Sequence, residues 1–386
     1  MPRYNPILNQ LRTYPAVAVD ECKARLLESG RTVYDFGKGD PEEPPPKFVP
    51  NALRDAVQPR MPYPKVKGSL AVRQSIADYM QRRFGVVLDA ESQILPTSGS
   101  KEAVFHMPLL VIDRDAPDRG VVFPEPGYPA YQRGALFAGG EAIAAHLTGD
   151  HILRPSLLPE DVIERTRLVW LNTPHNPSGA VMGLDDLQRA ADFCRERDIL
   201  LVADETYADV YQSEPPHSLL ECGVEGVLVL HSLSKRSGMT GYRSGFLAGD
   251  ADLIGRLAVL RTNPGLVPTD FVNVAATAAW SEDSHVAERR ALFAKKKDLF
   301  LDLFDELGFT VLGREASLYL WVAVPGGDDE AYATRLLDYG IVVSPGRIFG
   351  VDGGGHGYIR LAMVPNMDDC KEAIELWRKM EKSWKR

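Results

Sequence analysis

The chain has 386 residues and a formal net charge of -9, which disfavours nucleic acid as its main partner because phosphate backbones attract basic surfaces. Hydrophobic residues make up 45% and charged residues 25%, as in ordinary globular proteins, and the length allows two or three domains and an enclosed cofactor. The N-terminal residues lack the apolar segment of a signal peptide, and no run of about 18 apolar residues predicts a membrane span.

The first half of the chain predicts an α/β domain. Pro41–Pro50 is rich in proline and is expected to be extended. Beyond it, amphipathic segments alternate with short, continuously apolar runs, a pattern typical of a mostly parallel sheet covered on both faces. The predicted helices are Leu70–Phe84, Lys101–Ile112 and Asp185–Arg197. The predicted strands are Val121–Phe123, Leu168–Leu171, Ile199–Ala203, Val227–Leu230 and Gly245–Ala248.

The last hundred residues predict a smaller α+β domain. Asp283–Leu307 is expected to be one long helix that leaves the first domain. Strands at Leu318–Val324 and Tyr358–Ala362 and helices at Glu330–Tyr339 and Met367–Lys382 follow it. We therefore predict an N-terminal arm that forms part of the small domain (1–46), a large domain (47–282) and a small C-terminal domain (283–386).

Polar motifs follow several predicted strands, and ligands of parallel sheets bind at those carboxyl ends. Gly99-Ser100-Lys101 opens a helix, whose first backbone N–H groups are suited to a phosphate, although a Gly-Ser before a helix is common. Tyr128, in PEPGYPAY, is placed either to stack on a flat heteroaromatic ring or to fill the core.

Two further motifs carry an amide and a carboxylate. Asn176, in LNTPHNPSGAV, is placed to direct its amide into a cleft, or belongs to a plain Asn-Pro turn. Asp204 ends a strand, where a buried carboxylate needs a partner such as a protonated pyridine nitrogen, and Tyr207 is in reach of the phenolic oxygen of the same ring. The alternative is that Asp204 only caps a following helix.

The most informative segment runs from Ser232 to Gly245 and directly follows the apolar strand VLVL. Lys235 would lie at the end of that strand, where loss of solvent lowers the pKa of an amine and makes it nucleophilic. Ser232, Ser234 and Arg243 would surround it with hydroxyls and a fixed cation, which suits a phosphate, although a surface loop also explains the segment. Together the motifs predict an amine, a carboxylate, an aromatic ring and a phosphate site, the set that pyridoxal phosphate requires.

Over nearly its whole length the sequence resembles the class I/II aminotransferases, the pyridoxal-phosphate enzymes of fold type I. Three motifs carry the resemblance. They are Ser232-x-x-Lys235 with Gly241-Tyr-Arg243-Ser-Gly245, Asn172-x-Pro-x-Asn176-Pro-x-Gly179, and Asp204-Glu-x-Tyr207. The resemblance implies a large domain with a mostly parallel, seven-stranded sheet and a smaller α+β domain. It also implies a homodimer, with the active site at the interface and with no role for nucleic acid or membrane.

The resemblance also implies roles for individual residues. Lys235 would bond the cofactor covalently and move the substrate proton, with Asp204 on the pyridine nitrogen and Tyr207 and Asn176 on the ring oxygen. Tyr128 would stack on the ring. The phosphate would be held by Gly99, Ser100, Lys101, Ser232 and Arg243, together with Tyr63 from the neighbouring subunit. Arg360 would bind the substrate α-carboxylate, and Gly39 matches a glycine of the family's N-terminal substrate segment.

The expected reaction is transamination between an amino acid, with glutamate as the expected donor, and a 2-oxo acid. Leu260–Lys297 and Ser317–Pro325 resemble N-succinyl-diaminopimelate aminotransferases, which favours N-succinyl-2-amino-6-ketopimelate of lysine biosynthesis as substrate. Aspartate or broad specificity, and β-elimination by a C–S lyase, remain alternatives. Cations for an acidic substrate would come from Lys38, Lys65, Lys67 and Arg261, unless these are surface charges. No metal site is expected, since Cys22, Cys194, Cys222 and Cys370 lack ligand spacing and predict reduced thiols in a cytoplasmic protein.

Overall fold

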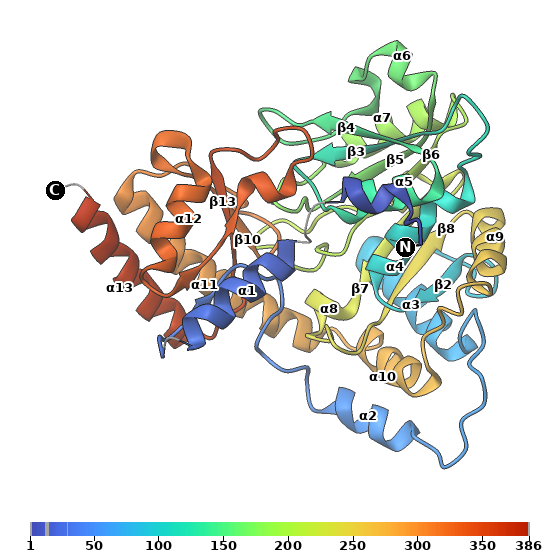
Figure 1. The fold of residues 1–386 in the computed structure, drawn as a ribbon. Coiled ribbons are helices and arrows are strands. Elements are labelled where there is room, and N and C mark those ends of the chain that lie inside the picture. The colour runs from blue at the N-terminus through green and yellow to red at the C-terminus, as the bar shows by residue number, and fades with distance from the viewer. Residues whose placement is uncertain (1, 12–14, 29, 385–386) are drawn as a thin grey trace.

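The computed structural model describes residues 2–11, 15–28 and 30–384. A seven-stranded sheet flanked by helices forms the larger part of the molecule. A second part, built mainly from the C-terminal residues together with α1, lies beside it (Figure 1).

The large sheet has the strand order β2-β8-β7-β6-β5-β3-β4, and only β8 runs antiparallel to its neighbours. The predicted α/β architecture is therefore confirmed. Its strands are β2 (Ile94–Thr97), β3 (Gly120–Glu125), β4 (Glu141–His146), β5 (Thr166–Asn172), β6 (Leu200–Asp204), β7 (Val227–Ser232) and β8 (Gly245–Gly249). All five strands predicted for this sheet are present. Four are longer than predicted by one to three residues, and β6 is shifted by one residue, while β2 and β4 were not predicted.

Helices cover both faces of this sheet, which explains the continuous apolar runs in its central strands. Alternate residues of β5 point to opposite faces: Val169 and Leu171 belong to one hydrophobic cluster, and Leu168 and Trp170 to the other. The first cluster includes residues of α3 (Leu70–Phe84), α7 (Leu184–Arg195) and α10 (Asp270–Trp280). The second includes residues of α4 (Ser100–His106), α5 (Ala130–Ala138) and α9 (Ala251–Arg261).

Two predictions about proline-containing segments are wrong in part. The stretch expected to be extended up to Pro50 already enters α2 (Phe48–Ala56), because a proline in the first helical turn gives up no intrahelical hydrogen bond. The helix expected over Lys101–Ile112 is α4 followed by a 3-10 turn, η2 (Met107–Leu110), since Pro108 has no N–H to continue the α-helical ladder.

The second part of the molecule has its own sheet, with the order β12-β13-β10-β9, and the two-stranded pair β1-β11. β1 comes from the N-terminal region and pairs in parallel with β11. The strands are β1 (Tyr34–Asp35), β9 (Val311–Leu312), β10 (Tyr319–Ala323), β11 (Ile341–Val342), β12 (Ser344–Pro345) and β13 (Tyr358–Ala362). Its helices are α1 (Pro15–Glu28), α11 (Ser284–Leu307), α12 (Asp329–Leu337) and α13 (Met367–Trp384).

The remaining helical segments are short connectors, and one of them carries a site residue. This is α8 (Leu233–Arg236), which directly follows β7. The others are α6 (Glu160–Ile163), η1 (Pro6–Gln10), η3 (Pro155–Leu157), η4 (Leu219–Cys222), η5 (Pro325–Gly327) and η6 (Gly346–Phe349).

Three features of the described residues concern membrane spans, cysteines and metal sites. None of their helices combines the length and the apolar character that crossing a bilayer would require. Cys194, Cys222 and Cys370 are buried and unbonded, whereas the side chain of Cys22 lies outside the described part. Within that same part, histidine, cysteine and acidic side chains form no group of three suited to a metal ion.

Candidate active site

A cavity of about 520 Å³ lies at the carboxyl ends of the parallel strands. It brings together residues that are up to 323 positions apart in sequence, from Gly37 to Arg360. The predicted site residues that line it are Gly39, Ser100, Lys101, Tyr128, Asn176, Asp204, Tyr207, Ser232, Lys235, Arg243 and Arg360. Two predicted residues are not on its wall: Gly99 lies just behind Arg243, and Tyr63 is fully exposed.

Asp204 presents a buried carboxylate at the end of β6. One oxygen accepts from the Thr206 hydroxyl at 2.6 Å and its backbone N–H at 3.2 Å, and the other accepts from the Tyr131 hydroxyl at 3.0 Å. Burial raises the pKa of Asp204, and these hydrogen bonds offset only part of the rise. Turns follow Asp204 rather than a helix, so its carboxylate is not a helix cap. It is a fixed acceptor suited to a cationic or N–H group in the cavity.

Lys235 lies on α8, the turn that directly follows β7. Its Nζ donates to the backbone oxygen of Gly39, so the lysine contacts the N-terminal segment across the cavity. Burial lowers the pKa of Lys235 to about 8; Asp40 opposes this shift, and Arg360 and Arg243 reinforce it. The amine is thus a nucleophile that becomes neutral about two pH units below an ordinary lysine.

The lowered pKa of Lys235 predicts its chemical reactivity in cofactor-free protein. Acetic anhydride attacks only the neutral amine, so trace labelling of Lys235 should rise with pH and reach half its maximum near pH 8. A model lysine peptide should titrate near the ordinary value of 10.5. Peptide mass spectrometry after labelling at a series of pH values measures both, and a Lys235 midpoint near 10.5 would show that burial does not act as described.

Groups suited to an anion lie on the same cavity wall as Lys235. α4 begins at Ser100 after Gly99, whose φ of 79° belongs to the left-handed region, and Ser100 and Lys101 at the start of this helix line the cavity. A Cβ on Gly99 would lie 2.5 Å from Nη2 of Arg243, which places this guanidinium against the start of the helix. Ser232 caps α8, and its hydroxyl donates to Ser234 at 3.0 Å. Hydroxyls and a guanidinium at the start of a helix are groups suited to a phosphate.

A second guanidinium, from Arg360 on β13, lines the same cavity. It donates to the side chain of Asn176 at 2.9 Å and to the backbone oxygen of Gly37 at 2.8 Å. The rings of Tyr319 and Phe349 lie 4.1 and 4.5 Å from its central carbon. Because these contacts fix a buried cation, it is prepared to bind a carboxylate without rearrangement.

Sequence reasoning missed four residues of this site: Thr206, Tyr131, Tyr319 and Phe349. Thr206 and Tyr131 donate hydrogen bonds to Asp204. The hydroxyl oxygen of Tyr319 lies 3.1 Å from the hydroxyl oxygen of Tyr207. The only sequence signal was proximity, since Thr206 and Tyr131 lie two and three positions beyond Asp204 and Tyr128. The suggestion of Arg261 as a cation for substrate is wrong, because it is 2% exposed and paired with Glu102 at 2.7 Å.

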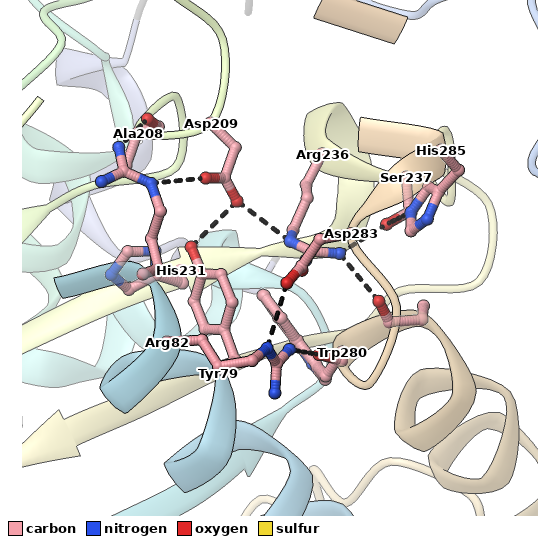
Figure 2. A network of polar contacts seen from close by, with 12 residues as sticks. Tyr79, Arg82, Ala208, Asp209, His231, Arg236, Ser237, Trp280, Asp283 and His285 are labelled. Carbon is pink, nitrogen blue, oxygen red and sulfur yellow. Dashed lines mark hydrogen bonds and ion pairs between the residues drawn. The ribbon is translucent and has the colours of Figure 1, made fainter. Parts of the chain in front are cut away.

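A network of polar contacts surrounds Arg236, the residue that follows Lys235 in the sequence (Figure 2). Arg236 is buried and lies 2.9 Å from a carboxylate oxygen of Asp209, which also accepts from Tyr79 at 2.9 Å. The same guanidinium donates to the Ala279 backbone oxygen at 2.7 Å and pairs with Asp283. Burial alone would raise the pKa of Asp209, but Arg236 and Arg83 hold it below its usual range. The network therefore fixes α8 relative to β6 and to the start of α11.

Loss of Arg236 should destabilise the fold, because it leaves Asp209 buried with one cation fewer. We expect Arg236→Met to lower the free energy of unfolding by about 3–5 kcal/mol, the usual effect of removing one partner of a buried pair. Arg256→Met is the matched control, since the Arg256–Asp252 pair is exposed, and it should leave the free energy of unfolding close to the wild-type value. Urea unfolding measures both, and equal effects would contradict this role for Arg236.

Comparisons with known proteins agree with this geometry. A family model described as Aminotransferase class I and II matches residues 31–376. The LL-diaminopimelate aminotransferase of Aquifex aeolicus is 32% identical over 385 residues, which cover 97% of this chain and 98% of that protein. The structure of an aminotransferase from Neisseria meningitidis matches with a TM-score of 0.89 at 30% identity, covering 98% and 100%. Substrate-bound BacF from Bacillus subtilis matches with a TM-score of 0.92 at 25% identity, covering 98% of each chain.

Proposed function

Because this chain belongs to the class I and II aminotransferases, whose members use pyridoxal phosphate, we propose that its cavity holds the cofactor on Lys235 and transaminates a diaminopimelate-type amino acid. One observation carries the proposal: Lys235, Asp204 and Arg360 line a single cavity. The amine of Lys235 would bond the cofactor aldehyde, and the buried acid of Asp204 would pair with the ring nitrogen. The fixed guanidinium of Arg360 would bind the substrate carboxylate.

The residues present fit the cofactor. Asp204 would accept from the ring nitrogen, and the site formed by Gly99, Ser100, Lys101, Ser232 and Arg243 would hold the phosphate. A side chain at Gly99 would displace the Arg243 guanidinium, so this glycine keeps the phosphate site open. Tyr128 would pack on the ring, and Asn176 and Tyr207 would hold its oxygen. When bound, pyridoxal phosphate supplies an electron sink for the substrate carbanion.

The chain's own residues then have separate tasks. Arg360 binds the α-carboxylate and so orients the α-carbon towards Lys235. Lys235 takes the α-proton, and its lowered pKa makes the neutral amine available near pH 8. The hydrogen bond from Arg360 to Asn176 links the substrate carboxylate site to the group that holds the ring oxygen.

Two charged residues on the cavity wall favour a substrate that carries charges at both ends. Asp40 and Lys38, which pairs with Asp20 in this structure, are both on the cavity wall. The far end of LL-diaminopimelate carries a carboxylate and an ammonium, which would pair with Lys38 and Asp40, respectively. Several relatives that are 31–33% identical carry the name LL-diaminopimelate aminotransferase. We therefore place LL-diaminopimelate ahead of the N-succinyl compound that the sequence favoured, whose succinylated end has no ammonium for Asp40.

A panel of amino donors tests this choice. With 2-oxoglutarate as acceptor, kcat/KM should be at least about tenfold higher for LL-diaminopimelate than for aspartate, since one well-placed charge pair contributes about that factor. Lys38→Ala should raise KM for LL-diaminopimelate while leaving KM for alanine unchanged, and Lys371→Ala, which removes an exposed charge on α13, is the control. N-succinyl-diaminopimelate forms a second arm. Robust turnover with aspartate alone would contradict the proposal, and pyruvate release from cystathionine without an acceptor would instead indicate a lyase.

We further propose a cytoplasmic homodimer in which Tyr63 reaches the partner's phosphate site. Tyr63 is fully exposed, and three other large apolar side chains of the same stretch, Val57, Met61 and Leu70, are 37–53% exposed. A partner surface would remove this apolar area from water. Light scattering should give twice the mass of one chain, and Tyr63→Ala should weaken cofactor retention. A monomer with full cofactor occupancy would contradict the dimer.

A further inference from the structure

A buried carboxylate near the cavity, Glu125, has no role in the chemistry described above. Glu125 is the last residue of β3 and is 1% exposed. Its Oε1 accepts three backbone N–H groups, from Val351 at 2.7 Å, Asp352 at 2.6 Å and Gly354 at 3.2 Å. Burying a carboxylate is costly unless it is satisfied in this way, and charge-assisted bonds are about twice as strong as neutral ones.

The partner of Glu125 is a glycine-rich loop over residues 350–357, between η6 and β13. The loop fits closely around the carboxylate, because a Cβ on Gly354 would lie 2.6 Å from Cγ of Glu125. Residues 351–354 belong to no strand or helix, so three of their N–H groups depend on Glu125 for a partner. The other carboxylate oxygen, Oε2, lies 3.0 Å from Nδ1 of His146, which is half exposed.

Both ends of this loop lead to the substrate carboxylate site. Phe349 comes directly before it, lines the cavity and packs against the Arg360 guanidinium, while Arg360 itself lies three residues after it on β13. The backbone oxygen of Phe349 accepts from Gly127 at 2.9 Å, next to Tyr128 in the segment that follows Glu125. One carboxylate on the large sheet therefore holds the loop that connects the two groups forming one side of the carboxylate site.

We infer that Glu125 is a positioning residue that binds loop 350–357 to the large sheet and thereby keeps Phe349 and Arg360 in place for the substrate carboxylate. This inference rests on the proposed function, because it assigns the α-carboxylate to Arg360. Its effect reaches the substrate through the loop, since Glu125 is not on the cavity wall. Loss of the carboxylate thus acts on substrate binding more than on proton transfer at Lys235.

Three variants of the holoenzyme test the inference. Glu125→Ala removes the acceptor of all three N–H groups and should raise KM for the amino acid about 10- to 100-fold, the effect of misplacing a binding group by about 1 Å, with kcat changed less than about threefold. Glu125→Gln keeps a carbonyl acceptor and should restore KM to within about tenfold of wild type. His146→Ala, which leaves the three bonds intact, is the matched control and should leave KM unchanged.

Hydrogen exchange provides a readout that does not depend on activity. In Glu125→Ala the amides of Val351, Asp352 and Gly354 should exchange at least about tenfold faster, while amides of β5–β7 keep their rates. Unchanged exchange in the loop would overturn the role of Glu125 even if the enzyme transaminates as proposed. Faster exchange with an unchanged KM would overturn the link to Arg360. A wild type without transaminase activity would instead refute the proposed function, and the exchange data would still decide whether Glu125 holds the loop.

Discussion

Lys235→Met should lower kcat/KM for transamination by about 10⁴-fold or more, because it removes both the nucleophile for the cofactor and the base for the α-proton. The purified variant should also lose the visible absorbance of the covalently bound cofactor. Among the described residues that line the cavity, Lys235 carries the amine that lies on α8, directly after the central strand β7. Steady-state kinetics and absorbance spectra measure the two losses together.

Lys371→Met is the matched control for this change. Lys371 lies on α13 in an exposed pair with Asp368, so its loss should leave both the spectrum and kcat/KM at wild-type values. A Lys235→Met variant that kept the cofactor absorbance and more than about 1% of the activity would contradict the assignment of this lysine.

Arg360→Gln should raise KM for the amino acid strongly and lower kcat/KM by about 100- to 1,000-fold. The guanidinium is buried between two aromatic rings and fixed by Asn176 and Gly37, so no other described group is positioned to replace its charge at the α-carboxylate. Truncating one partner of a buried charge pair costs about 2–5 kcal/mol, which corresponds to these factors. Kinetics with amino acid concentrations up to saturation separate KM from kcat.

Arg347→Gln serves as the control for Arg360. Arg347 lies on η6, close to the loop, but its guanidinium pairs with Asp329 at 2.9 Å and is not on the cavity wall. This control should change kcat/KM far less than Arg360→Gln. If the Arg360 variant kept its KM and lost only kcat, the guanidinium would act on the reaction step rather than on the carboxylate.

The sequence predicted the strands that are buried on both faces of the large sheet. Strands such as β6 and β7 are apolar along their length because helices cover both faces, and this pattern is visible in one sequence. β4 was not predicted, because it lies at the edge of the sheet and is only partly buried. Its sequence, EAIAAH, is rich in alanine and is equally compatible with a helix. β2 contains Pro96, which interrupts the strand signal.

The candidate site was predictable where its residues follow strands. Asn176, Asp204 and Lys235 follow β5, β6 and β7, and parallel strands bring their carboxyl ends to one edge. Tyr319 lies inside a strand of the second sheet and Tyr131 inside a helix, where aromatic residues usually fill a core. Nothing in the sequence marked Tyr319, and only its proximity to Tyr128 marked Tyr131. The contacts of Glu125 span 226 to 229 positions, and no local pattern encodes such a pairing.

Borohydride reduction of the wild-type protein is the most direct test of the central claim, that Lys235 holds the cofactor. Reduction fixes the cofactor to its lysine, and peptide mass spectrometry then identifies the residue. The account predicts the added mass on the peptide that contains Lys235 and on no other. Added mass on a different lysine, such as Lys101 on the same cavity wall, or no added mass in a protein that had been given pyridoxal phosphate, would contradict it.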